Sequence, residues 1–173
     1  MSKHIGVTGK YTNNGIPKGF TTITPFIVVN NPREAIEFYN SVFNARVKDT
    51  TEFTDESGNK IIVHAELDFG NGCLQLGAAN PAYKLMLPPT GDEACYSLAI
   101  YVDEVDKVFE NAVERGAKVR EPIANFVSGD RFASILDPFN VRWTIMTRIE
   151  DLSEEESSRR VREWADSSNK AEK

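Results

Sequence analysis

The feature that most constrains the fold is a sequence that repeats once along the chain. Three pairs of segments match at offsets of 73, 72 and 69 residues: TPFIVVN (24–30) with SLAIYVD (97–103), NARV (44–47) with GAKV (116–119), and DFGNGCLQL (68–76) with DPFNVRWTI (137–145). A drift of four residues is what differences in loop length produce. The period is too long, and the copies are too few, for a solenoid. The chain is therefore predicted to contain two copies of one module.

Each copy shows the same order of elements: strand, helix, strand, strand, strand. β-Branched and aromatic runs predict the strands, while Pro32 suits a first helical turn and Gly116 a helix end. The predicted strands are 20–29, 46–54, 59–69, 72–78, 95–102, 118–126, 130–137 and 141–148, and the predicted helices are 30–45 and 103–117. This order is typical of an α+β fold built from tandem βαβββ modules.

Three segments lie outside this pattern. Residues 1–19 are predicted to be a loose arm that carries His4, and 78–94 a long loop lining a site. Ser153 and Glu156 form a capping box before a charged helix, whose Trp164 is expected to pack on the domain or on a partner subunit. The predicted organisation is an arm (1–19), one domain (20–150, with modules at 20–78 and 94–148), and a helix and tail (151–173).

Composition narrows the function classes. The 173 residues are 40% hydrophobic, enough for one domain with a core, and a net charge of −6 argues against nucleic-acid or membrane-surface binding. No stretch is apolar enough for a membrane span or a signal segment, and Cys73 and Cys95 are too few for a disulfide scaffold. A reducing cytoplasm is therefore the expected location. Because only His4 and His64 are present, imidazole chemistry is limited.

The phrases TPFIVVNNPREAIEFYNSVFNA, HAELDFGNGCLQL, SLAIYVDEVDKVFENAVERGA and GDRFASILDPFNVRWTIMT resemble the vicinal oxygen chelate superfamily, over about residues 20–150. This group contains glyoxalase I, extradiol dioxygenases, fosfomycin-modifying enzymes and bleomycin-binding proteins. Within it, the sequence is most similar to the PhnB-like branch. The resemblance implies a glyoxalase-like fold, in which the modules form a curved, barrel-like mixed sheet with the helices outside. It also implies a ligand in the crevice of that sheet and a homodimer.

The resemblance further implies where a metal ion would bind. Metal-dependent members carry ligands on the first and last strands of each module, and these positions correspond here to Thr24, Gln75, Ser97 and Thr144. Zinc, iron and nickel prefer imidazole or carboxylate ligands, whereas these positions hold three hydroxyls and one amide. We therefore expect no metal and no other cofactor, and no NAD, ATP or CxxC motif is present.

Strand parity predicts which other side chains share the crevice face with those four positions. The opposite face is apolar and is expected to pack under the helices; it comprises Ile27, Val29, Leu74, Leu76, Ile100, Val102, Trp143 and Ile145. The crevice face is mixed; it comprises Phe26, Val28, Cys73, Ala99, Tyr101, Arg142 and Met146. Aromatic stacking area would come from Phe26, Tyr101, Phe126 and Phe132, with Tyr83 and Met86 from the loop.

Two groups of charged residues are candidates for chemistry. His64 is predicted to share a strand face with Ile62, Glu66 and Asp68, so that His64 and Glu66 act as a general acid or base, or form an ordinary surface pair. Asp130 and Arg131 belong to a turn, where Arg131 either pairs with a nearby acid or joins Arg142 in holding an anionic group. The thiols of Cys73 and Cys95 are expected to be buried and inert.

Three functions remain open from the sequence. The favoured one is a metal-free protein that binds or sequesters a small molecule, with Gln75, Arg142 and Thr144 as polar contacts. The second is a glyoxalase-like lyase, isomerase or dioxygenase-type enzyme in which His64 and Glu66 move a proton. The third is a dimeric interaction module. The absence of the usual metal ligands at all four positions would impair a metal-dependent enzyme more than a binding protein. The sequence therefore favours binding over catalysis.

Overall fold

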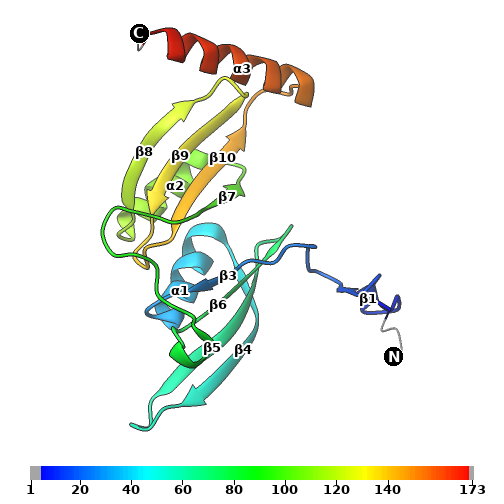
Figure 1. The fold of residues 1–173 in the computed structure, drawn as a ribbon, viewed down its shortest axis with the longest axis vertical. Helices are drawn as coiled ribbons and strands as arrows, with labels where there is room; N and C mark the ends of the chain where they lie inside the picture. The colour runs from blue at the N-terminus through cyan, green and yellow to red at the C-terminus, as the bar shows by residue number, and fades with distance from the viewer. Residues whose placement is uncertain (1–4, 172–173) are drawn as a thin grey trace. The chain divides into compact units, whose positions relative to one another are not determined.

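The computed structural model describes residues 5–171, so His4 lies outside the described part of the chain. The chain divides into two compact units, Met1–Pro88 and Pro89–Lys173. Each contains one four-stranded mixed sheet with a helix against it (Figure 1). The predicted α+β architecture of tandem βαβββ modules is therefore confirmed.

The first unit holds the first module. Its sheet has the strand order β3-β6-β5-β4, in which β3 and β6 are parallel and the other neighbours antiparallel. The elements are β3 (Phe26–Val28), α1 (Pro32–Phe43), β4 (Arg46–Thr54), β5 (Lys60–Asp68) and β6 (Cys73–Gly77), followed by the 3-10 turn η1 (Pro81–Tyr83). Helix α1 packs on β4 and β5.

The second unit repeats this topology with the strand order β7-β10-β9-β8, and β7 and β10 are the parallel pair. Its elements are β7 (Ser97–Tyr101), α2 (Val105–Glu114), β8 (Lys118–Asn125), β9 (Asp130–Leu136), β10 (Arg142–Arg148) and the C-terminal helix α3 (Glu154–Ala171). Helix α2 contacts β8, β9 and β10. The same order of elements thus produces the same sheet twice.

The two module helices begin in different ways. The Asn31 side chain accepts a hydrogen bond from the backbone N–H of Glu34 at the start of α1. No side chain caps α2 in this way; instead, the Thr147 hydroxyl on β10 accepts from the N–H of Val105 at 2.9 Å. The start of α2 is therefore tied to the sheet, whereas the start of α1 is satisfied locally.

The helix-facing side of each sheet forms a core, as strand parity predicts. Val29, Leu76 and Ile145 are completely buried, and Ile27, Leu74 and Trp143 are at most 4% exposed. Ile100 and Val102 on the β7 edge are half-buried. Burying a large aliphatic side chain contributes about 1.5–3 kcal/mol, so these faces supply much of the stability of each unit.

The first strand is shorter than predicted. It begins at Phe26 rather than near residue 20, so Thr24 precedes the strand. Pro25 has no N–H to donate to a ladder, although its carbonyl accepts a hydrogen bond from the N–H of Gln75 at 2.8 Å. The prediction of a long strand was wrong: residues 20–25 have the β-branched composition of a strand, but Pro25 interrupts the hydrogen-bond ladder.

The N-terminal arm carries a small hairpin that the sequence analysis did not predict, β1 (Thr12–Asn13) and β2 (Ile16–Pro17) (Figure 1). Asn14 and Gly15 form its turn with φ of 48° and 82°. These are the backbone conformations of a type I′ turn, for which Asn-Gly is a strong signal. The sequence contains this dipeptide, but it lacks the flanking hydrophobic alternation that usually accompanies a hairpin.

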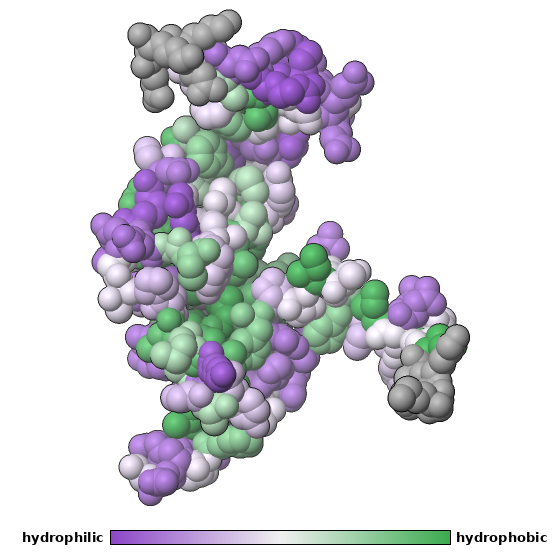
Figure 2. All heavy atoms as spheres, in the orientation of Figure 1, coloured by the Kyte–Doolittle hydropathy of each residue, from purple (hydrophilic) through white to green (hydrophobic). Residues whose placement is uncertain are grey.

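Helix α3 joins the second unit through an aromatic contact. Trp164 packs edge-on against Phe126, with ring centroids 5.0 Å apart, so the predicted packing of Trp164 on the domain is confirmed. Half of the predicted capping box forms: the Ser153 hydroxyl accepts from the N–H of Glu156 at 3.1 Å, while the Glu156 carboxylate pairs with Arg159 and Arg160. Figure 2 shows hydrophilic residues gathered over this helix. No helix in the described residues could cross a bilayer.

Candidate functional site

The face of each sheet that lies opposite its helix is here called its open face. On the first sheet, four side chains from three strands meet on this face: Phe26 (β3), His64 and Glu66 (β5) and Gln75 (β6). We call them the first-sheet cluster. The sheet register explains the meeting, because Gln75 pairs with both Phe26 and Glu66 across neighbouring strands.

The first-sheet cluster combines an aromatic surface with polar groups. The His64 and Phe26 rings are stacked at a centroid distance of 5.8 Å. His64 Nε2 lies 3.6 Å from Glu66 Oε1, and the Gln75 amide donates to that oxygen at 3.2 Å. The side chains of His64 and Glu66 are 34% and 23% exposed, so a ligand could reach them.

A β-bulge corrects the predicted face of β5. His64 pairs with Thr51, but Ile62 pairs with the next residue, Glu52, so Val63 is an extra residue in the strand. Ile62 therefore turns to the helix side, where it is 4% exposed and where Glu52 reaches Arg33 of α1 at 2.6 Å. The expectation that Ile62 shares a face with His64 was wrong, because strict alternation does not survive a bulge.

Part of the arm lies at the same sheet. The thiol of Cys73 donates to the carbonyl of Gly19 at 2.8 Å, and Lys48 Nζ lies 3.8 Å from the centre of the Phe20 ring. Both thiols were expected to be buried; Cys73 is, at 6% exposure, whereas Cys95 is exposed because it lies in the exposed segment before β7. These contacts hold residues 19–20 against the β4 and β6 strands.

The open face of the second sheet carries a different set of groups, the second-sheet cluster. It consists of Ser97 (β7), Glu121 (β8), Ser134 (β9), and Arg142 and Thr144 (β10). The Ser97 and Thr144 hydroxyls are 3.3 Å apart. Arg142 donates through Nε to the buried Ser134 hydroxyl at 3.1 Å and through Nη2 to Glu121 at 3.0 Å.

The structure separates Arg131 from Arg142, contrary to the hypothesis that they hold an anion together. Arg131 pairs across β9 and β10 with Thr147, on the helix side, and makes two hydrogen bonds of 2.7 and 2.6 Å to Asp106 of α2. The guanidinium lowers the pKa of Asp106 through these bonds and its charge. Of the two alternatives, the structure supports pairing with a nearby acid, because parity places residues 131 and 142 on opposite faces.

The remaining predicted residues gather near the other end of the second sheet. Asp130, 6% exposed, accepts from Arg148 at 2.8 Å and from the Ser128 hydroxyl at 2.7 Å. The hydrogen bond that Arg148 donates to the Tyr101 side chain and the charge of Asp130 raise the pKa of Arg148. Phe126 packs between Phe132 and Trp164, so its ring is already engaged inside this unit.

The four positions that correspond to a metal site do not fit one. Each has an internal hydrogen bond: Thr24 donates to the carbonyl of Thr21, Gln75 to Glu66, and Ser97 and Thr144 bond to each other. Among the described residues, no group of three or more His, Cys, Asp or Glu side chains could hold a metal ion. Hydroxyls and amides are weak ligands for transition metals, so the donor set argues against this chemistry.

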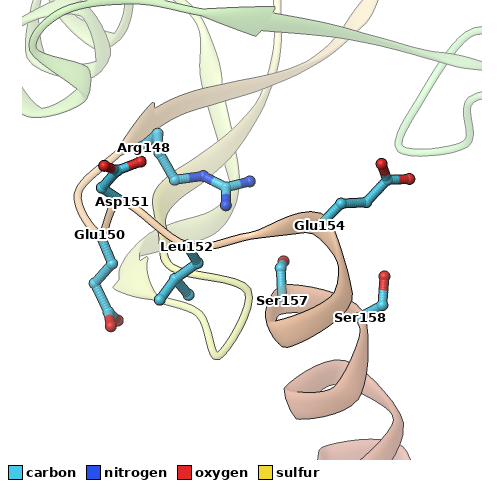
Figure 3. Close-up of a pocket in the computed structure, with 7 residues that line it drawn as sticks. All are labelled: Arg148, Glu150, Asp151, Leu152, Glu154, Ser157 and Ser158. Carbon is cyan, nitrogen blue, oxygen red and sulfur yellow. The ribbon is translucent and has the colours of Figure 1, made fainter.

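A pocket of about 360 Å³ lies elsewhere, between the end of β10 and the start of α3 (Figure 3). Its lining comprises Arg148, Glu150, Asp151, Leu152, Glu154, Ser157 and Ser158. None of the sequence-predicted site residues lines it, and Arg148 is engaged by Asp130. Three carboxylates in so small a lining disfavour an anionic ligand.

Sequence reasoning missed several polar residues that complete these faces: Lys48, Glu121 and Ser134. Lys48 and Arg120 each stand where the register of an edge strand shifts, between Val47 and Asp49 and between Val119 and Glu121. Polar residues inside strands were the available signal for Glu121 and Ser134. Their pairing with Arg142 depends on register, which the sequence did not reveal.

Comparison with known proteins places this geometry in a family. Residues 20–145 match the family model described as the Glyoxalase/Bleomycin resistance protein/Dioxygenase superfamily. An uncharacterized protein of Mycobacterium bovis is 25% identical over 137 residues, which cover 78% of this chain and 88% of that protein.

Solved structures share the fold. Protein PA1353 from Pseudomonas aeruginosa is 26% identical, with a TM-score of 0.60 over 74% of this chain and 98% of that one. A PhnB protein from Bacillus cereus is 18% identical, with a TM-score of 0.58 over 73% and 99%. A FosX mutant from Listeria monocytogenes, complexed with Mn(II) and dihydroxypropylphosphonic acid, is 13% identical, with a TM-score of 0.53 over 70% and 85%.

Proposed function

Because the chain belongs to the glyoxalase/bleomycin resistance protein/dioxygenase superfamily, we propose that it is a PhnB-like member that binds a small molecule on the open face of its first sheet without a metal ion. The first-sheet cluster carries this proposal. It offers a stacked pair of rings beside hydrogen-bonding groups, which is the mixture that small-molecule sites use.

The state of the metal positions supports binding without a metal. The FosX structure shows that Mn(II) binds on this fold in another protein. In this chain Gln75 is engaged by Glu66, and Ser97 by Thr144. A metal ion at these positions would have to break those bonds in exchange for weak ligands.

Ligand binding can be tested with a library of neutral aromatic compounds, read out by thermal shift and isothermal titration. Phe26→Ala should weaken a confirmed ligand about tenfold or more, because it removes the stacking surface next to His64. Tyr11→Ala is the matched control, since Tyr11 is a 72% exposed aromatic of the arm hairpin. Equal affinity of wild type and Phe26→Ala for every ligand would contradict a site on the first sheet.

Metal analysis of protein purified without chelators tests the other half of the proposal. The expected result is less than about 0.1 divalent ion per chain, since such a donor set binds transition metals weakly. A stoichiometric ion that is lost in Thr24→Ala and Gln75→Ala variants would overturn binding without a metal.

A second candidate function is proton transfer by His64 and Glu66 in a glyoxalase-like reaction. The observation that favours it is the 3.6 Å approach of Nε2 to Oε1 on an accessible face. His64→Gln separates the two functions, because Gln keeps hydrogen-bonding capacity but cannot exchange a proton near neutral pH. Ligand affinity should change by less than about threefold in either case. An enzyme should lose its turnover in this variant, whereas a binder has no turnover to lose.

We also propose a cytoplasmic homodimer. Both cysteines are free thiols, which suits a reducing compartment. Strand β4 is an edge strand of nine exposed residues, including Phe53 at 61% exposure, and such edges favour pairing with another chain. Sedimentation at micromolar concentration tests the dimer, and a monomer there would refute it.

A further inference from the structure

The arginines on β8, β9 and β10 differ in one respect. In Arg131, Arg142 and Arg148 both Nε and Nη2 have hydrogen-bond partners. In Arg120 only Nη2 has one, at 2.6 Å from Asp92 Oδ1. Its Nε is buried without a partner, which holds for no other buried side-chain nitrogen or oxygen of the described residues.

A buried Nε–H without a hydrogen-bond partner destabilises the folded state, because the guanidinium keeps its charge in proteins and cannot lose the proton instead. Leaving a buried donor unsatisfied costs about 1–3 kcal/mol, more for a charged group. The Arg120 side chain is only 18% exposed, so bulk water does not solvate it freely. Arg120 therefore has one nitrogen, Nη2, paired with Asp92 and a neighbouring nitrogen, Nε, without a partner.

The partner of Arg120 is easy to exchange. The Asp92 side chain is 77% exposed and belongs to a run of exposed residues, 89–96, that precedes β7. An ion pair with so exposed a partner contributes about 0–1 kcal/mol. Arg131 shows what a complete arrangement looks like in the same unit: one carboxylate accepts from Nε and Nη2 together.

We propose that Arg120 forms an anion site of the second unit, which binds the carboxylate or phosphate group of a small molecule through Nε and Nη2 together. Asp92 is the internal carboxylate that this group displaces. This site goes beyond the proposed binding function on the first sheet, and its ligand class is a molecule with at least one negatively charged oxygen group. It also replaces Arg131 with Arg120 as an anion-binding residue.

The Nε–H of arginine is observable by ¹H–¹⁵N spectroscopy, and an Arg120→Lys variant assigns its signal. Two probes distinguish the sources of the oxyanion: inorganic phosphate and benzoate, each compared with sodium chloride at equal ionic strength. The Arg120 Nε signal should move saturably with at least one probe, with a dissociation constant on the order of 10 mM or tighter. In Arg120→Lys, binding should weaken about tenfold, because lysine cannot form the two-pronged contact.

Asp92→Asn is the decisive variant, because it removes the competing carboxylate from an exposed loop and leaves the fold intact. It should tighten oxyanion binding about fivefold. Asp103→Asn is the matched control, since Asp103 is another exposed aspartate of the same unit and the substitution changes the net charge equally. The control should move affinity by less than about twofold.

Three results would overturn the inference: a signal that follows chloride and the oxyanions equally, no saturation up to 50 mM, or equal effects of Asp92→Asn and Asp103→Asn. Binding of neutral aromatic compounds with no oxyanion effect would leave the proposed function standing without this inference. An oxyanion effect, with no ligand whose affinity falls in Phe26→Ala, would leave this inference standing without the proposed function.

Discussion

The two sheets come from one repeated module, yet they have only one face in common. On the helix side Leu76 and Ile145 occupy equivalent positions, and both are completely buried. On the open side, the first sheet carries an imidazole, a carboxylate and an amide, whereas the second carries arginines paired with acids. The comparison teaches that the two modules keep the same apolar residues where side chains must be buried under a helix. On the opposite faces, where burial is not required, their side chains differ in chemistry.

The hairpins that connect the last two strands of each module show the same contrast. Asp68 and Asp137 are equivalent by the repeat. Asp137 is 3% exposed and accepts hydrogen bonds from the N–H groups of Phe139 and Val141 and from the Trp143 indole. Asp68 accepts from Gly70 and pairs with Arg46, whose side chain is 74% exposed. One aspartate supports a core; the other lies at a surface.

The largest effect is expected on the shared face. Leu76→Ala and Ile145→Ala should each lower the free energy of unfolding by about 2–5 kcal/mol, because each leaves a cavity beneath a helix. Urea denaturation followed by circular dichroism measures both. If one substitution cost less than about 1 kcal/mol, the two helix-facing cores would not be equivalent.

The hairpin aspartates should differ by about 2 kcal/mol. In the wild type, three donors share the two carboxylate oxygens of Asp137. Asp137→Asn replaces one of these oxygens with an NH₂ group, which cannot accept, so at least one buried donor loses its partner. We expect a cost of about 2–3 kcal/mol for Asp137→Asn and below about 1 kcal/mol for Asp68→Asn in the same denaturation assay. Equal costs would erase the contrast between the two hairpins.

Helix α3 has no counterpart in the first unit, and Trp164→Ala measures its attachment. The loss should be about 1 kcal/mol, the size of an edge-to-face aromatic contact, because Trp164 is 47% exposed. Trp143 remains as a fluorescent reporter of unfolding. A Phe126→Leu, Trp164→Ala double variant gives the coupling, and strictly additive effects would show that the contact contributes nothing.

The smallest effect concerns pH. Hydrogen bonds and charge from Arg159 and Arg160 lower the pKa of Glu156 to about 2 from 4.5. Because the pKa is lower in the folded state, the stabilisation is present above about pH 4.5 and is lost as the pH falls through 2. Carboxyl NMR titration of Glu156 checks this, with Arg159→Gln expected to move the midpoint upward. A midpoint near 4.5 in the wild type would show that these exposed pairs do not persist in solution.

Local pattern predicted most of the elements well. Strand β4 begins and ends where the sequence analysis placed it, and α1 lies inside its predicted range, because alternation and helical spacing report which residues are buried. The face of Gln75, Ser97 and Thr144 also followed from parity. The face of Ile62 did not, because the bulge at Val63 inserts one residue and inverts every side chain beyond it.

Pairings between charged groups were the least predictable. Arg131 was linked to Arg142 by their shared chemistry, but Asp106, 25 positions away in the chain, takes its guanidinium. No local pattern in the sequence distinguishes Arg120, because the unpaired state of its Nε depends on Asp92 and on the register of β8. Distant partners depend on the loops and bulges that set strand register, and these leave weak local signals.

The sequence by itself determined the duplicated module, the order of its elements and the apolar side of each sheet, because hydrophobic periodicity and repetition are properties of neighbours along the chain. Tertiary structure decided which polar groups meet: His64 with Glu66 and Gln75, Arg131 with Asp106, and Arg120 with Asp92. Hydrogen bonds require atoms within about 3 Å, and only strand register and loop geometry bring distant residues that close.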